Sequence, residues 1–413
     1  MVSAPRRDPD RAHIWSALAH RGFRLYWSGA FVSSIGSWLQ LTAVLWLVRS
    51  IGSDALVGFV NLVSWVPTLF LGLFIGAMAD RMDRRRMVLV SQAVMMVCSV
   101  LIGLAIASAG IHEGTLIAFL SVSGIAYAFF VMAWIATIPV LVPKDDLLSA
   151  VTLNNVQFNL ARFVGPLVGG WLLAVAGDQV PFYVNALTFG AFMILIVVSH
   201  AAMPPAVPVG GNVGSAVLQA FRYVRENAWM TRILVAVCGL SFFGFSFIVL
   251  LPSISTRVLH VSEHGYGLLM GMTGFGALGG MLAVAVLRPR VGLETMMSLG
   301  ALLTAAFLVA LALSRSYWLS CLLAAGAGGS FVLCNAAAGT ALQGNVTPEM
   351  QGRVSSMWTV AFVGTFPIGG LLLGVLSDAF SPEAALLAAG LACLAVGIAV
   401  TLWVSVPAGP RPD

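Results

Sequence analysis

One arginine in the middle of an apolar segment has the strongest potential for chemistry in this sequence. Arg162 lies about ten residues into the segment, or roughly 15 Å from its start at 1.5 Å per residue. An arginine at a membrane helix centre costs about 2.5–3.5 kcal/mol to insert, so the side chain must face protein or water. Asn155, Asn159 and Arg162, at i, i+4 and i+7, share one helix face. This face predicts a polar wall that binds a small molecule, with a structural arginine bonded to backbone carbonyls as the alternative.

Three more amides lie within apolar segments. Gln40 and Asn335 fall near the middle of their segments, and Asn61 lies in a third. Together with the three residues above, we take them as candidates to line a substrate cavity. Each has a structural alternative, because a single amide inside a membrane helix also makes interhelical hydrogen bonds.

No set of residues in the sequence indicates catalysis. The sequence has no P-loop, HExxH or GxSxG, and its five cysteines show no CxxC spacing. The stretch from Gly274 to Gly279 matches GxGxxG, but it follows no strand and lies in an apolar helix, where it indicates close helix packing. We predict no enzyme, no catalytic residue, no metal, no cofactor and no ATP-driven transport by this chain.

Carboxylates are absent from the middle of the apolar segments and lie near their ends, as Asp54, Asp80, Asp178, Glu263 and Glu383. Proton-coupled transporters often use a buried carboxylate. A proton site here would therefore lie at a membrane edge or use another group. His260 and His264 titrate near neutrality, with exposed loop histidines as the alternative interpretation.

The composition requires a lipid environment. Of the 413 residues, 59% are hydrophobic and 9% charged, whereas soluble domains carry about 25% charged residues. The apolar runs are long and continuous, which predicts helices of about 20 residues or more. The net charge of +5 comes from basic residues in short loops, so we predict a lipid bilayer and no nucleic acid as partner.

Twelve membrane spans are expected. They lie at 23–48, 55–79, 87–109, 115–142, 152–176, 180–203, 231–259, 265–287, 294–313, 316–342, 354–377 and 383–406. If the N-terminus is inside, 17 of the 21 Lys and Arg residues lie inside, three lie outside and Arg162 lies within a span. This asymmetry predicts a multi-pass protein with both termini in the cytoplasm.

The chain divides into two related halves. We expect a cytoplasmic tail at 1–22, a six-helix bundle at 23–203, a linker with an amphipathic helix at 204–230, a second six-helix bundle at 231–406, and a cytoplasmic tail at 407–413. Phe163-Val164-Gly165, Gly169-Gly170 and Asp178 recur 199 to 200 residues later as Phe362-Val363-Gly364, Gly369-Gly370 and Asp378. The fold class is therefore all-α membrane, with two pseudo-symmetric bundles and a site between them near the midplane.

The loop after the second span has a glycine four residues before Asp-Arg, followed by a basic cluster. Gly76 would allow close helix approach, and Asp80 can face the positive N-terminus of another helix. Arg81, Arg84 and Arg85 would anchor the loop at an anionic leaflet. A plain basic loop is the alternative.

This loop resembles the signature of the major facilitator superfamily. The resemblance implies that Asp80 meets the start of the eleventh span, near Arg353 to Ser356, and holds the cytoplasmic side shut. Asp83 departs from the family pattern, which usually has glycine there, so the turn geometry is in doubt.

The stretches from Pro139 to Gly170 and from Thr347 to Val354 are similar to the transmembrane-effector branch of that superfamily, which includes enterobactin exporters and macrolide efflux proteins. The branch commonly has a basic residue near the position at which this chain has Trp134. The resemblance implies a proton-coupled antiporter that exports a drug, natural product or siderophore from a bacterial cytoplasm, acting as a monomer. A lysophospholipid flippase, a nutrient importer and a non-transporting membrane sensor are the alternatives.

Overall fold

The structure is a computed structural model that describes residues 15–79, 83–109, 112–199, 213–346 and 348–403. The regular structure of these residues is entirely helical, with short turns between helices and no strand. The N-terminal bundle consists of α1 (Arg21–Ile51), α2 (Asp54–Ala79), α3 (Arg84–Ala109), α4 (Glu113–Leu141), α5 (Leu147–Ala176) and α6 (Val180–Ser199).

The C-terminal bundle begins with a span whose helix is irregular. This span contains α8 (Ala228–Leu240), η4 (Ser241–Phe245), η5 (Ser246–Leu250), α9 (Leu251–Ser253) and η6 (Ile254–Val258). The other helices of the bundle are α10 (Glu263–Leu287), α11 (Leu293–Leu313), α12 (Tyr317–Gly344), α13 (Pro348–Val363), α14 (Phe366–Ala379) and α15 (Pro382–Trp403). The amphipathic helix α7 (Val213–Glu226) precedes α8 along the chain.

The all-helical membrane fold predicted from the sequence is confirmed. Eleven segments of the described residues are long and apolar enough to cross a membrane. The other predicted span corresponds to α2, a helix of 26 residues. Exposed tryptophans such as Trp171, Trp318 and Trp403 lie near span ends, where aromatic rings favour the membrane interface.

The predicted eleventh span is not one continuous helix. It is divided between α13 and α14 at Gly364 and Thr365, just before Pro367, which has no N–H to continue a helix. Serines of the neighbouring irregular span contact carbonyls near this break. The Ser241 hydroxyl donates to the Phe362 carbonyl and the Ser246 hydroxyl to the Phe366 carbonyl, both at 2.6 Å. These bonds satisfy polar backbone groups that lipid could not satisfy.

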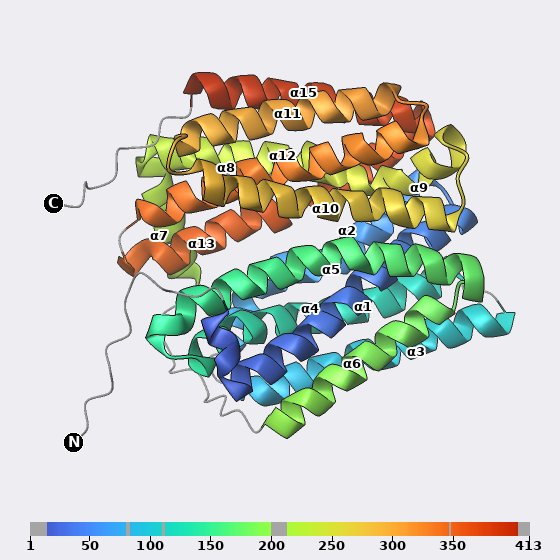
Figure 1. Cartoon of the computed structure of the whole chain (residues 1–413), viewed down its shortest axis with the longest axis horizontal. Helices are drawn as coiled ribbons and strands as arrows, with labels where there is room; N and C mark the ends of the chain where they lie inside the picture. Colours follow the sequence, from blue (N-terminus) through green and yellow to red (C-terminus); the bar gives the residue numbers. More distant parts are fainter. Residues whose placement is uncertain (1–14, 80–82, 110–111, 200–212, 347, 404–413) are drawn as a thin grey trace.

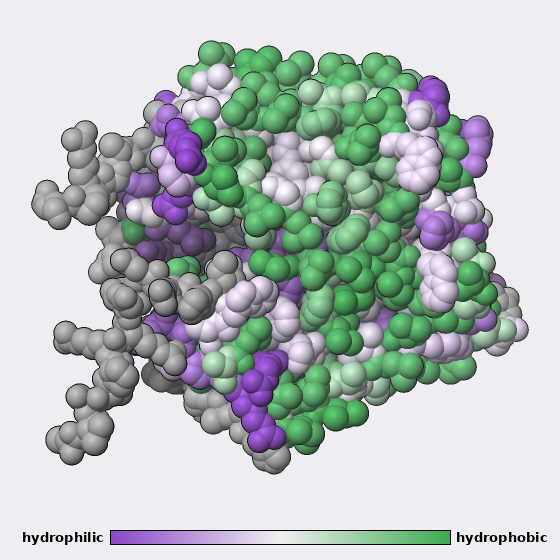
Figure 2. All heavy atoms as spheres, in the orientation of Figure 1, coloured by the Kyte–Doolittle hydropathy of each residue, from purple (hydrophilic) through white to green (hydrophobic). Residues whose placement is uncertain are grey.

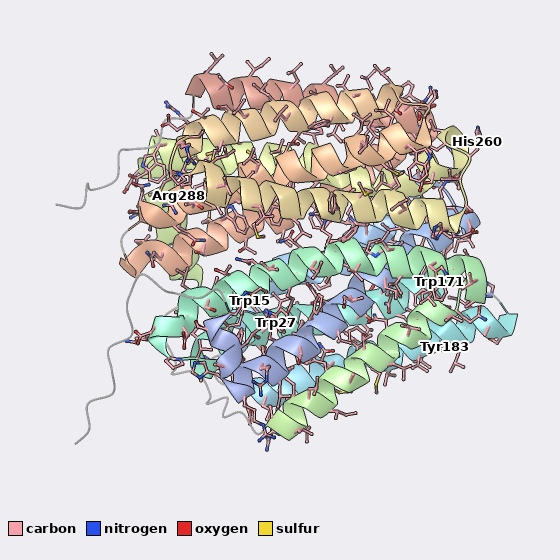
Figure 3. All side chains as sticks on the ribbon, viewed as in Figure 1. Trp15, Trp27, Trp171, Tyr183, His260 and Arg288 are labelled. Carbon is pink, nitrogen blue, oxygen red and sulfur yellow. The ribbon has the colours of Figure 1, made fainter. Side chains whose placement is uncertain are left out.

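The two bundles lie side by side with their helices roughly parallel (Figure 1). Helix α7 and residue Arg288 lie at one end of the helices, which we call the α7 end, and His260 lies at the other (Figures 1 and 3). We call this second end the Asp54 end, after the first residue of α2. The visible flank is largely hydrophobic, as expected for a lipid-facing surface (Figure 2).

The bundles contact each other through two glycine-rich helix pairs. On α5 and α10, a Cβ atom added at Gly267 would lie 2.6 Å from the Pro166 carbonyl oxygen. On α2 and α14, a Cβ atom added at Gly58 would lie 2.6 Å from the Gly370 carbonyl oxygen. Small residues permit this close approach in a membrane. Near the α7 end, by contrast, Figure 2 shows a hollow with hydrophilic residues between the bundles.

Candidate functional site

A cavity of about 330 Å³ lies within the N-terminal bundle. All six helices, α1 to α6, contribute to its wall, and the part of the chain that the structure describes places no charged side chain there. Its size is at the lower end of the range of small-molecule pockets, about 300–1,000 Å³. The cavity is therefore large enough for a small organic molecule.

Polar and aromatic side chains dominate the wall. The polar group is Ser33, Ser34, Ser37, Gln40, Ser64, Gln92, Ser123, Asn154, Gln157 and Asn185. The aromatic group is Trp38, Trp65, Tyr127, Phe130, Trp134, Phe158 and Phe189. This mixture of rings with hydrogen-bonding groups is typical of a site for an amphipathic molecule.

Gln40 is the one cavity candidate from the sequence that lines this wall. Its Oε1 accepts hydrogen bonds from the Ser99 hydroxyl at 2.5 Å and from Asn185 Nδ2 at 2.7 Å. These bonds join α1, α3 and α6. Gln40 therefore makes the interhelical hydrogen bonds of the structural alternative and also lines the cavity, and its role in substrate binding stays a prediction.

Arg162 lies beside the cavity, at the boundary between the bundles. Its side chain is buried, and its guanidinium carbon lies 5.6 Å from the Trp38 ring centroid and 4.8 Å from that of Phe245. Trp38 belongs to the cavity wall in α1, whereas Phe245 belongs to the C-terminal bundle. A cation between two aromatic faces is attracted by both. Arg162 Nη2 has no hydrogen-bond partner in the described part of the chain.

The other cavity candidates lie elsewhere. Asn155 is exposed, and its carbonyl accepts a bond from Asn159 Nδ2 at 2.9 Å. Asn335 Nδ2 donates to the Phe331 carbonyl at 3.1 Å. Asn61 is buried between α2 and α14, and neither of its amide atoms has a partner among the described residues. The substrate-binding roles of these residues remain predictions.

Among the polar cavity residues that the sequence interpretation did not name are the amides of Asn154, Gln157 and Gln92. On α5 the cavity side carries Asn154 and Gln157, one or two positions before the predicted Asn155 and Asn159. One residue along a helix rotates the side chain by about 100°, so the predicted face was turned away from the cavity. Gln92, within the third predicted span, carried the same signal as Gln40: an amide inside an apolar run.

Part of the loop after α2 lies outside the described residues. Gly76 belongs to α2, whereas Asp80 and Arg81 are not described. Arg84 is the first residue of α3, and Arg85 Nη2 donates to the Val197 carbonyl of α6 at 3.2 Å. The Asp83 carboxylate accepts bonds from the backbone N–H groups of Arg85 and Arg86. Asp83 therefore caps α3, which explains an aspartate at this position.

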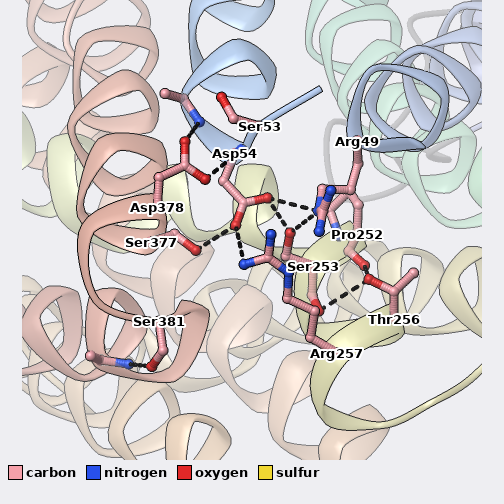
Figure 4. A network of polar contacts seen from close by, with 12 residues as sticks. Arg49, Ser53, Asp54, Pro252, Ser253, Thr256, Arg257, Ser377, Asp378 and Ser381 are labelled. Carbon is pink, nitrogen blue, oxygen red and sulfur yellow. Dashed lines mark hydrogen bonds and ion pairs between the residues drawn. The ribbon is translucent and has the colours of Figure 1, made fainter. Parts of the chain in front are cut away.

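A charged network joins the two bundles at the Asp54 end (Figure 4). The Asp54 carboxylate is fully buried and lies 3.0 Å from Arg49 Nε and 3.7 Å from Arg257 Nη1. It also accepts hydrogen bonds from the hydroxyls of Ser253 and Ser377. Four separate segments meet at this one carboxylate: the end of α1, the start of α2, the α9–η6 region and α14.

A second pair of carboxylates lies at the same end and has no ion pair among the described residues. Burial raises the pKa of Asp178, in the loop after α5, and the negative charge of Glu263 at the start of α10 raises it further. Both effects disfavour the ionised form. Asp178 and Glu263 belong to different bundles, so their repulsion acts on the contact between the bundles.

Comparison with known proteins places this architecture among transporters. The family model described as "Transmembrane secretion effector" matches residues 12–411. The enterobactin exporter EntS of Escherichia coli O1:K1 / APEC is 26% identical over 93% of this chain and 92% of its own length. The staphyloferrin A transporter of Staphylococcus aureus is 24% identical over 64% of this chain and 66% of its own length.

Solved transporter structures share the fold. The nucleoside transporter NupG has a TM-score of 0.70 at 12% identity, over 92% of this chain and 98% of that one. A bacterial homolog of the human lysosomal transporter Spinster, solved in an inward-facing and unoccupied conformation, has a TM-score of 0.69 at 16% identity, over 93% and 95%.

Proposed function

This chain belongs to the transmembrane secretion effector family of the major facilitator superfamily, and we propose that it exports a small amphipathic molecule across a bacterial cytoplasmic membrane by alternating access. The molecule would be a drug, a natural product or a siderophore. The relatives named as exporters support the direction of transport.

The cavity in the N-terminal bundle is the observation that carries this proposal. It supplies a volume of about 330 Å³ lined by rings and hydrogen-bonding groups, as an amphipathic substrate requires. The bundles contact each other at the Asp54 end and leave a hollow near the α7 end (Figure 2). Such an arrangement is one of the two states that alternating access requires.

The topology and the gate complete the proposed cycle. The α7 end faces the cytoplasm, both termini are cytoplasmic, and the chain acts as a monomer. In the opposite state, Gly76, Asp80, Arg81, Arg84 and Arg85 hold the cytoplasmic end shut. Arg162 changes its aromatic neighbours as the bundles rock. Proton coupling is supported by the Asp178 and Glu263 pair, whose repulsion opposes contact at the Asp54 end.

Accumulation measurements test the proposal. The protein would be expressed in a bacterial host without its main efflux systems and supplied with a panel of macrolides and siderophores. We expect lower accumulation of at least one compound, and loss of this effect in the Asp80→Asn variant at equal membrane abundance. Equal accumulation of every compound with and without the protein would contradict the proposed export of this class.

A further inference from the structure

The cavity has the chemistry of a site for one class of ligand. We propose that it binds an uncharged aromatic molecule that both donates and accepts hydrogen bonds, and that this is the class of substrate transported. The inference rests on the transport function proposed above and narrows it.

The absence of charge in the wall excludes strongly ionic ligands. All the described lining residues are neutral, and the nearest buried cation we identify, Arg162, lies next to Trp38 and does not itself line the cavity. An ion that leaves water for such a site loses its hydration without gaining an ion pair. A polycarboxylate would therefore bind poorly here.

Two buried glutamines present one unpaired donor and one unpaired acceptor. Gln92 is 0% exposed; its Oε1 accepts a bond from the Ser33 hydroxyl, and its Nε2 has no partner among the described residues. Gln157 is 2% exposed; its Nε2 donates to the Ser34 hydroxyl, and its Oε1 has no partner in the same part of the chain. Buried polar groups without partners are costly, so both atoms favour a ligand that supplies the missing bonds.

Other polar atoms of the wall extend this pattern. Asn154 Oδ1 and the Ser123 hydroxyl also lack hydrogen-bond partners among the described residues. The unpaired atoms include two carbonyl oxygens, which require a donor such as a hydroxyl or an amide N–H on the ligand. The ligand must therefore carry several hydrogen-bonding groups and remain neutral.

The rings of the wall are held in place by other rings. Trp134 stacks on Tyr26 with centroids 4.9 Å apart, and Trp65 meets Phe366 edge-on at 5.2 Å. Rings fixed in this way offer flat surfaces to an aromatic ligand without further ordering. Trp65 also links the cavity to α14 of the other bundle, so a ligand against it can influence the contact between bundles.

Binding of three related compounds to the purified full-length protein tests the charge requirement. The first probe is chloramphenicol, which is uncharged and has an aryl ring, two hydroxyls and an amide. The second is its hemisuccinate, which adds a carboxylate, and the third is the methyl ester of the hemisuccinate, which removes the charge and adds only one methyl group. By isothermal titration calorimetry we expect the methyl ester to bind at least ~10-fold more tightly than the hemisuccinate, because the buried anion has no partner.

Two variants of cavity residues test whether chloramphenicol binds in this cavity. Asn154→Leu and Gln157→Leu should each weaken chloramphenicol binding about 5-fold by removing a hydrogen bond, while Gln219→Leu, at an exposed residue of α7, should not. Equal or tighter binding of the hemisuccinate, no binding of either neutral probe, or full binding by both variants would overturn the proposal.

Transport in proteoliposomes is measured separately. Binding without transport would count against the export function alone, and transport of ionic compounds alone would count against the ligand class alone.

A second inference concerns the Asp54 end and rests on different contacts. The sequence Gly374-Val-Leu-Ser-Asp378 at the end of α14 has the same spacing as Gly76-Ala-Met-Ala-Asp80 after α2. A Cβ atom added at Gly374 would overlap the Asp54 carbonyl oxygen, and Gly58, one turn further into α2, faces Gly370. As residue numbers rise in α2, they fall in α14, so the two helices are antiparallel and Gly374 lies beside the start of α2.

At the Asp54 end this motif is engaged. The Asp378 carboxylate accepts hydrogen bonds from the backbone N–H groups of Asp54 at 2.9 Å and Ala55 at 2.8 Å. These N–H groups have no partner within α2, and the positive end of a helix attracts a carboxylate. We infer that Gly374 and Asp378 form a latch that closes the Asp54 end, and that release of this latch accompanies closure of the α7 end.

Hydrogen–deuterium exchange of the full-length protein tests the latch. In Asp378→Asn and Gly374→Ala, we expect amides of residues 50–58 to exchange at least ~10-fold faster, as the released helix end frays. Exchange should slow at the α7 end, in residues 148–158 and 276–287, as the bundles close there. Asp80→Asn should shift both regions in the opposite direction.

Two variants serve as controls. Gly279→Ala adds a methyl group with no atom within 4 Å, and Asp145→Asn changes an exposed carboxylate outside the latch. Both should leave exchange unchanged. Faster exchange at residues 50–58 without slower exchange at the α7 end would reduce Asp378 to a local helix cap, and unchanged exchange in both latch variants would also overturn the inference.

Discussion

The carboxylate of Asp378 accepts a 2.9 Å hydrogen bond from the backbone N–H of Asp54, a residue 324 positions earlier in the chain. This bond brings two acidic residues together without direct repulsion between unpaired charges, because Arg49 and Arg257 lie beside the Asp54 carboxylate. Two carboxylates and two guanidinium groups balance in charge. The acidic groups of this network are therefore neutralised at the contact between the bundles (Figure 4).

Removal of the Asp54 charge should destabilise the protein. In Asp54→Ala, Arg49 loses its buried ion pair and the Ser253 and Ser377 hydroxyls lose an acceptor. Breaking a buried pair on one side costs roughly 3–5 kcal/mol. Thermal unfolding in detergent should show a markedly lower midpoint, whereas Asp145→Asn at an exposed site should unfold like the wild type. An unchanged midpoint in Asp54→Ala would show that the network adds no stability.

Variants of Arg162 should distinguish the contribution of its positive charge to transport from that of its planar guanidinium group. Arg162→Ala removes a cation that lies near both Trp38 and Phe245, and Arg162→Lys keeps the charge without the planar group. Each cation–π contact is worth about 0.5–2 kcal/mol. We expect transport to fall in both variants, with a smaller loss for lysine. Equal transport in Arg162→Ala and the wild type would assign the residue no part in the cycle.

Acidic conditions should favour contact at the Asp54 end. Burial and the Glu263 charge raise the pKa of Asp178 in this state, so Asp178 binds a proton more readily while the bundles touch. When this end opens, water would return the pKa towards its ordinary value of about 4. A state with the higher pKa gains population as pH falls, and loses it as pH rises through that pKa.

Single-molecule fluorescence can measure this pH dependence. Fluorophores on unnatural amino acids at the exposed positions Glu113 and Trp318 report the separation of the bundles at the Asp54 end. The separation should increase with pH in the wild type, and Asp178→Asn should weaken this response. His260 and His264 lie near the same end, so His264→Gln is measured in parallel. An identical pH response in Asp178→Asn would contradict the assignment.

Two glycines three residues apart on α10 should differ sharply in how well they tolerate substitution by alanine. A Cβ atom at Gly276 would overlap the Ala325 carbonyl oxygen of α12, whereas one at Gly279 would have no atom within 4 Å. Overpacking of this kind costs about 1–3 kcal/mol. Gly276→Ala should therefore lower the thermal midpoint, and Gly279→Ala should leave it unchanged. Similar midpoints would mean that α10 and α12 separate without cost.

The sequence determined the elements of this protein. Long apolar runs that end in charged or turn residues predicted the membrane helices, because each membrane span must satisfy its own backbone hydrogen bonds. The recurring Gly-Gly and Asp178/Asp378 pattern predicted two related halves. The motif after α2 pointed to the right superfamily, which the family match then confirmed.

The tertiary structure decided which residues meet. The choice between Gln157 and Asn159 for the cavity depends on the rotation of α5 about its axis. The neighbouring helices set this rotation, because polar residues occur on more than one face of α5. The pairing of Asp54 with Arg49, Arg257 and Asp378 is equally absent from local patterns. The sequence shows which charged residues lie at helix ends. Their partners come from distant segments, and packing of the helices alone brings those segments together.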